Sequence, residues 1–175
     1  MTTDSPVRSG QKLRPARPLI SIVAPCYNEA ESVDLFVETI FSILSGKDFE
    51  VELVFVDDGS TDETREKLCA LADRHPEIRL VIFSRNFGKE AALTAGLDHA
   101  EGDAVIVMDV DLQDPPELIL DFIEKWREGF EVVYGMREDR SSDSAAKRLT
   151  ANGFYQLFNK ISGVKIPQNT GDYRL

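Results

Sequence analysis

Cysteine, histidine and long apolar runs are all scarce in this 175-residue chain, and each shortage excludes a class of protein. The two cysteines, Cys26 and Cys69, cannot build a disulfide framework, which favours a reducing compartment. The two histidines, His75 and His99, lack the spacing of metal ligands, so a zinc site is not expected. No stretch approaches the roughly 18 apolar residues of a membrane-spanning helix, and the N-terminus lacks the apolar segment of a signal peptide. We therefore expect this chain alone to be soluble.

Two glycine-rich nucleotide-binding signatures are also missing. No G-x-G-x-x-G fingerprint follows an apolar run, which argues against a dinucleotide-dependent dehydrogenase. No Walker phosphate loop is present either, which argues against an ordinary ATPase.

Charge is plentiful but unevenly distributed. The net charge of −11 argues against a general nucleic-acid binder, so no nucleic-acid partner is expected. Residues 1–17 carry four basic and one acidic side chain, and residues 137–175 carry seven basic and four acidic ones. Residues 18–136 carry nine basic and 26 acidic side chains. An acidic centre between basic ends suits a metal-binding core beside a surface that meets anions, although solvated helix faces would explain the pattern equally well.

Short apolar runs alternate with helical patterns after a polar beginning. Residues 1–18 are basic and contain three prolines, which predicts a disordered leader ahead of one domain, 19–175. Val- and Ile-rich runs predict strands at Leu19–Ala24, Val51–Val56, Ile78–Ser84, Ala104–Met108 and Glu131–Tyr134. Helical patterns lie at about 30–45, 62–74, 89–100, 117–128 and 144–161. Ser60 or Thr61 is the expected cap of the second helix.

This alternation predicts an α/β fold, a mostly parallel sheet with helices on both faces. Right-handed crossovers place the carboxyl ends of parallel strands at one edge, where open α/β sheets bind ligands. Polar segments that follow the predicted strands should therefore meet there. They are Tyr27-Asn28-Glu29, Asp57-Asp58, Arg85-Asn86 and the acidic cluster that begins at Asp109.

The acidic cluster is the most informative of these segments. Asp109 and Asp111 follow an apolar run, and carboxylates this close repel each other unless a cation or strong donors neutralise them. One or two carboxylates together with substrate phosphates commonly hold Mg²⁺. Two acids near a turn are common, however, and Asp57-Asp58-Gly59-Ser60 also fits a plain strand-to-helix turn. Gly88-Lys89-Glu90 is either a simple helix start or a diphosphate site made by helix amides and Lys89.

Taken in order, these segments resemble a known family. Pro25-Cys26-Tyr27-Asn28-Glu29, Val56-Asp57-Asp58-Gly59-Ser60, Arg85-Asn86-Phe87-Gly88-Lys89 and Asp109-Val110-Asp111-Leu112-Gln113-Asp114 resemble the inverting family 2 glycosyltransferases, which have the GT-A (Rossmann-like) fold. The run from Ser84 to Gly96 and the segment Asn169–Leu175 are similar to the polyprenyl-phosphate branch. That branch contains bactoprenol glucosyltransferases and dolichyl-phosphate mannose synthases. Its members normally continue into membrane helices, whereas this sequence stops at Leu175.

The resemblance implies a role for each matching residue. Pro25, Tyr27 and Glu29 would line the base and ribose pocket, Asp57 would hold the nucleoside, and Asp58 and Lys89 would join the nucleotide-sugar site. Asp109 and Asp111, helped by Gln113, would hold Mg²⁺ or Mn²⁺ against the donor diphosphate. Arg137 would meet donor or acceptor phosphate, Arg148 the acceptor phosphate, and Asp172 would be the late catalytic aspartate.

The implied reaction transfers a sugar, glucose from UDP-glucose being favoured, to polyprenyl phosphate at the cytoplasmic face of a membrane. The alternatives are a GT-A enzyme acting on a saccharide hydroxyl, with Asp172 as a true base, and a non-catalytic nucleotide-sugar-binding domain. The basic leader and residues 137–165 are candidates for contact with anionic lipid headgroups.

Overall fold

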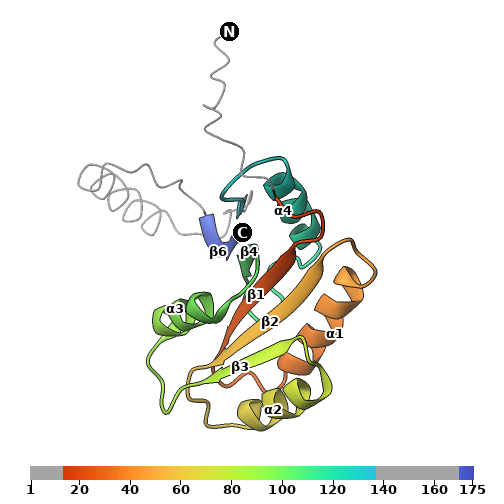
Figure 1. The fold of residues 1–175 in the computed structure, drawn as a ribbon. Helices are drawn as coiled ribbons and strands as arrows, with labels where there is room; N and C mark the ends of the chain where they lie inside the picture. Colours follow the sequence, from red (N-terminus) through yellow and green to blue (C-terminus); the bar gives the residue numbers. More distant parts are fainter. Residues whose placement is uncertain (1–13, 137–169) are drawn as a thin grey trace, which may run out of the picture.

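The computed structural model describes residues 14–136 and 170–175, which form a single twisted sheet with flanking helices (Figure 1). Within these residues the strands are β1 (Leu19–Cys26), β2 (Glu50–Asp57), β3 (Ile78–Ile82), β4 (Ala104–Val107), β5 (Tyr134–Met136) and β6 (Thr170–Arg174). The helices are α1 (Val33–Leu44), α2 (Thr64–Arg74), α3 (Lys89–His99) and α4 (Leu118–Arg127). The strand order across the sheet is β3-β2-β1-β4-β6-β5.

The first four strands are parallel, and this confirms the mostly parallel α/β fold expected from the sequence. β1 pairs with β2 on one side and with β4 on the other, and β3 extends the sheet beyond β2. β6 is antiparallel to both β4 and β5. Because the chain crosses from β3 back to the far side of β1, the strand order reverses between β1 and β4. Reversals of this kind open a crevice at the carboxyl ends of the strands.

Helices cover both faces of the sheet, as predicted. On one face the large buried core joins side chains of α1, α2 and α4 to β1, β2 and β4, with Phe36 and Phe55 in edge-to-face contact. On the other face α3 packs against β1 and β2 (Figure 1). Gly96 permits this close approach, because a Cβ there would lie 2.3 Å from Cγ1 of Val23. None of the helices in the described residues is both long and apolar enough to span a bilayer.

The last two strands differ from the prediction. Residues 131–133 were expected to begin a strand, but β5 starts at Tyr134, and Val133 exchanges two backbone hydrogen bonds with Leu175. No strand was predicted at Thr170–Arg174, since that segment has no apolar run. Its anchor is Tyr173, which is buried against Phe122 and donates its hydroxyl to the carbonyl of Pro115 at 3.0 Å. The predicted helix at 144–161 lies outside the described residues.

The end of the expected leader belongs to the domain. The guanidinium of Arg14 lies 4.0 Å above the Trp126 ring and donates to the carbonyl of Phe130. The carbonyl of Pro18 accepts a hydrogen bond from the amide of Glu50 at 2.8 Å. The ordered contacts therefore begin before residue 19. Residues 1–13 lie outside the described part, so the expected disorder stays a prediction.

A buried carboxylate braces the amino-terminal edge of the sheet. Glu52, which is 5% exposed, accepts hydrogen bonds from the Ser21 hydroxyl and from the amide of Glu101, and it pairs with Arg79 at 3.1 Å. These contacts join β1, β2, β3 and the loop before β4. They hold the strands together at the edge opposite to the one where the parallel strands end.

Candidate functional site

A cavity of about 300 Å³ lies where the strand order reverses, at the carboxyl ends of the parallel strands. Segments up to 86 residues apart in sequence contribute to its wall, as the parallel topology requires. The lining residues are Pro25, Cys26, Tyr27, Glu29, Asp58, Asn86, Gly88, Lys89, Ala92, Asp109, Val110 and Asp111. The sequence therefore correctly predicted which segments meet at this edge.

The acidic cluster follows β4 directly, and both of its first two aspartates line the cavity. Val110, which separates the two aspartates in the sequence, is buried and fixes the backbone between them. The turn is completed by Leu112 in the left-handed region, with φ 54°, and the amide of Gln113 donates to Oδ1 of Asp111 at 3.1 Å. The side chain of Gln113 is exposed and is not among the residues that line the cavity. The expected help of Gln113 to the two proposed metal ligands stays a prediction.

Lys89 brings a positive charge to this cluster. Its Nζ lies 2.9 Å from Oδ2 of Asp109, and both side chains are 41% exposed. Lys89 is the first residue of α3, and Gly88 before it has φ 97°, which favours glycine. Close carboxylates need a neutralising cation, and Lys89 supplies one. Lys89 therefore lies at the start of α3 beside the acidic cluster, and the expected diphosphate contact stays a prediction.

Asp58 fixes the loop that leads to Lys89. Its carboxylate is 3% exposed and accepts hydrogen bonds from the amides of Phe87 at 2.7 Å and Gly88 at 2.9 Å. Gly59 next to it has φ 68°, and a Cβ there would lie 2.3 Å from the carbonyl carbon of Arg85. The loops after β2 and β3 are therefore held together at the cavity wall.

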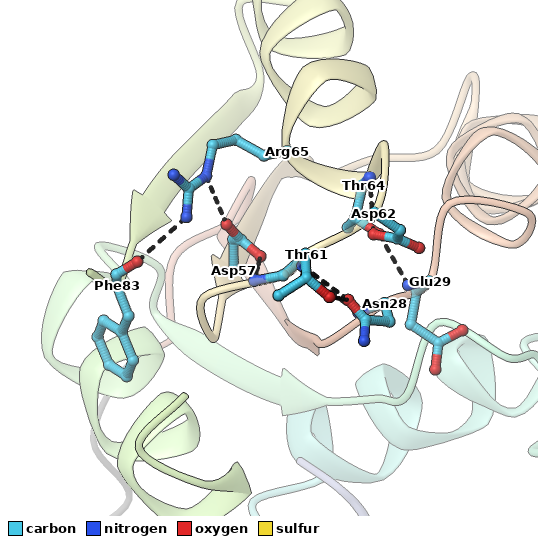
Figure 2. A network of polar contacts seen from close by, with 9 residues as sticks. Asn28, Glu29, Asp57, Thr61, Asp62, Thr64, Arg65 and Phe83 are labelled. Atoms are coloured by element: carbon cyan, nitrogen blue, oxygen red, sulfur yellow. Dashed lines mark hydrogen bonds and ion pairs between the residues drawn. The ribbon is translucent and has the colours of Figure 1, made fainter. Parts of the chain in front are cut away.

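Asp57, expected to hold the nucleoside, lies beside the cavity rather than in its lining. Its carboxylate is fully buried, accepts the amide of Ser60 at 3.0 Å and pairs with Nε of Arg65 at 2.9 Å (Figure 2). Arg65 also donates to the carbonyl of Phe83, so Asp57 joins α2 to the end of β3. It does not line the cavity, whereas Asp58 does. The expected contact of Asp57 with the nucleoside stays a prediction, and nothing in the sequence identified Arg65 as the partner of Asp57.

The end of β1 and the loop after it also line the cavity. Pro25, Tyr27 and Glu29 line it together with Cys26, which the sequence did not single out, and their expected contact with the base and ribose stays a prediction. Burial raises the pKa of the Cys26 thiol well above its usual value, and the carboxylates of Glu29, Asp57 and Asp109 raise it further. The thiol is therefore neutral and acts as a small apolar side chain in the wall.

The predicted helix cap is wrong. α2 begins at Thr64 with Glu63 at the cap position, and neither Ser60 nor Thr61 caps it. Both residues instead contact the loop after β1: the Ser60 hydroxyl accepts the amide of Asn28, and Thr61 donates to the Asn28 carboxamide. The side chain that accepts an amide at the start of α2 is instead Asp62, which bonds the Thr64 amide at 3.0 Å.

The remaining predicted residues are located only in part. Arg137 and Arg148 lie outside the described residues, so their roles remain predictions. The backbone of Asp172 belongs to β6, where Arg174 is opposite Val107 of β4. Because the two strands are antiparallel, Asp172 lies further toward the edge from which Asp109 extends.

The cavity suits a divalent cation carried in by a phosphate ligand. Among residues 14–136 and 170–175 no group of three or more His, Cys, Asp or Glu side chains could hold a metal ion. Two carboxylates are available at Asp109 and Asp111, and the Lys89 ammonium shows that a cation is accommodated beside the first. Mg²⁺ and similar ions commonly take one or two protein carboxylates and complete their shell with substrate phosphates and water. The donor set therefore fits such an ion.

Comparison with known proteins gives one consistent family. Residues 21–175 match the family described as glycosyl transferase family 2. A bactoprenol glucosyl transferase of Shigella phage SfV is 53% identical over 156 residues, which are 89% of this chain and 51% of the relative. The chain thus spans about half the length of the curated relatives it matches.

Solved structures agree with this family. A mannosyltransferase from Pyrobaculum calidifontis, in complex with GDP-Man and Mn²⁺, gives a TM-score of 0.59 at 27% identity and covers 77% of this chain and 41% of its own. Glucosyl-3-phosphoglycerate synthase from Mycobacterium tuberculosis, in complex with Mn²⁺, UDP and glucosyl-3-phosphoglycerate, gives 0.58 at 27% identity and covers 90% and 56%. The expected GT-A fold is confirmed by these matches.

Proposed function

Because the chain belongs to the family 2 glycosyltransferases, we propose that it transfers a sugar from a nucleotide diphosphate sugar to a polyprenyl phosphate with inversion. UDP-glucose and undecaprenyl phosphate are the favoured pair, since relatives more than 50% identical are bactoprenol glucosyl transferases. The observation that carries the proposal is the cavity at the strand reversal, lined by Asp109, Asp111 and Lys89.

The donor would occupy this cavity with its two ends on different walls. Pro25, Tyr27 and Glu29, which line the cavity, would contact the base and ribose, as the family resemblance implies. Lys89 and the first amides of α3 would contact the diphosphate, since a helix N-terminus and an ammonium both favour phosphate. The buried carboxylate of Asp58 would keep this second wall in place.

Asp109 and Asp111 would hold Mg²⁺ or Mn²⁺ beside the diphosphate. When bound, such an ion supplies Lewis acidity and orients the leaving nucleotide. The two structural relatives described above both contain Mn²⁺ together with a nucleotide or a nucleotide sugar, which supports the same requirement here.

The acceptor end of the reaction rests on the resemblance. An oxygen of the acceptor phosphate would form a bond to the anomeric carbon as the bond to the diphosphate breaks, and the nucleoside diphosphate would leave. Arg137 and Arg148 would bind these phosphates, and Asp172 would orient the acceptor or serve as a base. The acceptor phosphate is already ionised near neutral pH, so a strong base is less necessary than for a hydroxyl. The lipid acceptor would bring the enzyme to a membrane surface, with the cytoplasmic face expected.

The test is transfer of labelled sugar from UDP-glucose to undecaprenyl phosphate in detergent, with Mg²⁺ or Mn²⁺ present. Asp111→Ala should lower the rate by about 10²–10³, the usual loss when one electrostatic catalytic group is removed. Asp98→Ala is the matched control. It also removes an exposed carboxylate, but Asp98 does not line the cavity. A normal rate in Asp111→Ala would rule out the metal role, and transfer only to a saccharide hydroxyl would rule out the lipid acceptor.

A further inference from the structure

The turn after β1 is joined to the turn after β2 by hydrogen bonds in both directions (Figure 2). The amide of Asn28 donates to the hydroxyl of Ser60 at 3.0 Å. In return, the carboxamide oxygen of Asn28 accepts from the amide of Thr61 at 2.8 Å and from its hydroxyl at 3.3 Å. Asn28 therefore uses its backbone and its side chain on the same neighbouring turn.

The backbone of Asn28 is in an unusual conformation. Its φ is 56°, in the left-handed region that asparagine tolerates better than most residues. The hydrogen bonds from Thr61 hold the side chain of Asn28 in place. The chain leaves the last rung of the β1–β2 ladder, Cys26 opposite Asp57, and turns sharply two residues later.

The residues on either side of Asn28 face the cavity, whereas Asn28 does not line it. Tyr27 and Glu29 both belong to the cavity wall. The amide of Glu29 donates to the Thr64 hydroxyl at 2.8 Å (Figure 2). The carboxylate of Glu29 accepts a hydrogen bond from the Ser32 hydroxyl at 3.1 Å. The backbone between Tyr27 and Glu29 is thus held by the turn after β2 and by the first residue of α2.

From these contacts we propose that Asn28 is a positioning residue for the nucleoside end of the donor. It touches no ligand itself, and it sets the place of Tyr27 and Glu29 through its link to Thr61. This inference rests on the proposed function, because it assigns the wall after β1 to the base and ribose.

A purely structural role would have a different signature. The β1–β2 ladder pairs eight residues on each strand and holds the sheet whatever residue occupies position 28. The link to Thr61 lies beyond the last rung, at an exposed position, so its loss should disturb the cavity wall more than the sheet.

Asn28→Gly is the sharpest variant, because glycine keeps the left-handed backbone and removes the carboxamide. Affinity for UDP and GDP, each with Mn²⁺, is measured by calorimetry on the whole chain. We expect about a fivefold to tenfold loss for the nucleotide that the unaltered protein binds, the equivalent of about one hydrogen bond. Asn28→Asp keeps an acceptor for both Thr61 donors and should restore most of that affinity at about 0.15 M salt, where exposed charges are screened.

A double-mutant cycle with Tyr27→Ala separates positioning from general loosening. If Asn28 acts through Tyr27, Asn28→Gly costs much less affinity when Tyr27 is already alanine. Glu52→Gln is the control for stability, because it weakens a buried network at the far edge of the sheet. It should lower the melting temperature and leave nucleotide affinity unchanged.

The outcomes are distinct. Wild-type affinity in Asn28→Gly, or full additivity with Tyr27→Ala, would overturn the inference while leaving the proposed function intact. No binding of either nucleotide by the unaltered protein would instead contradict the proposed function. The two variants are also compared at an equal decrease in melting temperature. If Glu52→Gln then loses as much nucleotide affinity as Asn28→Gly, Asn28 has a structural role only, and the inference is overturned.

Discussion

Replacing Asp58 by asparagine changes one atom of the side chain and removes one acceptor from the cavity wall. The carboxylate is 3% exposed and accepts two backbone amides, from Phe87 at 2.7 Å and Gly88 at 2.9 Å. Asparagine can accept only one of them, and its NH₂ group then faces the other N–H donor. Charge-assisted hydrogen bonds contribute about 1.5–3 kcal/mol each, so we expect a loss of about 2–4 kcal/mol in the free energy of unfolding.

For a domain of this size, about 1 kcal/mol lowers the melting temperature by roughly 2–4 °C, which predicts a decrease on the order of 10 °C. Thermal and urea unfolding followed by circular dichroism measure this decrease. Asp98→Asn is the matched control, because it removes the same charge from the exposed far end of α3. Affinity for nucleotide with Mn²⁺ should fall in Asp58→Asn as well, since the freed loop carries Lys89. A variant as stable as wild type or more stable would show that repulsion among the clustered acids outweighs the two hydrogen bonds, and would refute the reasoning.

Two further predictions concern the same edge of the sheet. Gly59→Ala should destabilise the protein by more than about 2 kcal/mol, because it combines strain at φ 68° with a clash against the Arg85 backbone. Gly46→Ala is the control: φ is 71° there but nothing lies within 4 Å of the added Cβ, so backbone strain alone should cost about 1–2 kcal/mol. Equal losses of unfolding free energy for the two variants in urea would contradict the close packing at Gly59. Iodoacetamide at neutral pH should modify the exposed Cys69 and leave Cys26 intact, because the raised pKa of Cys26 suppresses its thiolate; rapid alkylation of Cys26 in a peptide mass map would contradict its burial.

The meeting of distant motifs could be predicted from sequence because it depends only on topology. Val- and Ile-rich runs separated by helices require parallel strands, and parallel strands place their following loops at one edge. Tyr27, Asp58, Lys89 and Asp109 therefore meet in the structure as expected. The predicted boundaries of the four helices within the described residues lie within about three residues of those observed, because periodicity and flanking breakers set them locally.

What could not be predicted depends on tertiary partners. Asp57 and Asp58 are adjacent, chemically identical and both buried, yet Asp57 pairs with Arg65 whereas Asp58 accepts the amides of Phe87 and Gly88 and lines the cavity. Nothing in the local sequence distinguishes them, because the partner of Asp57 comes from α2. Ser60 and Thr61 match a helix cap by spacing, but both form hydrogen bonds with Asn28 in the turn after β1 instead. β6 was missed because its place in the sheet comes from Tyr173 packing on Phe122, a contact that no period in the sequence encodes.

The most direct test of the central claim is a crystal structure of the protein with UDP-glucose and Mn²⁺, in which anomalous scattering locates the manganese. The proposed function predicts one strong peak in the cavity, between the donor diphosphate and the carboxylates of Asp109 and Asp111, with the uracil beside Tyr27. A nucleotide bound outside this cavity, or manganese held by other side chains while Asp109 and Asp111 face solvent, would contradict the account.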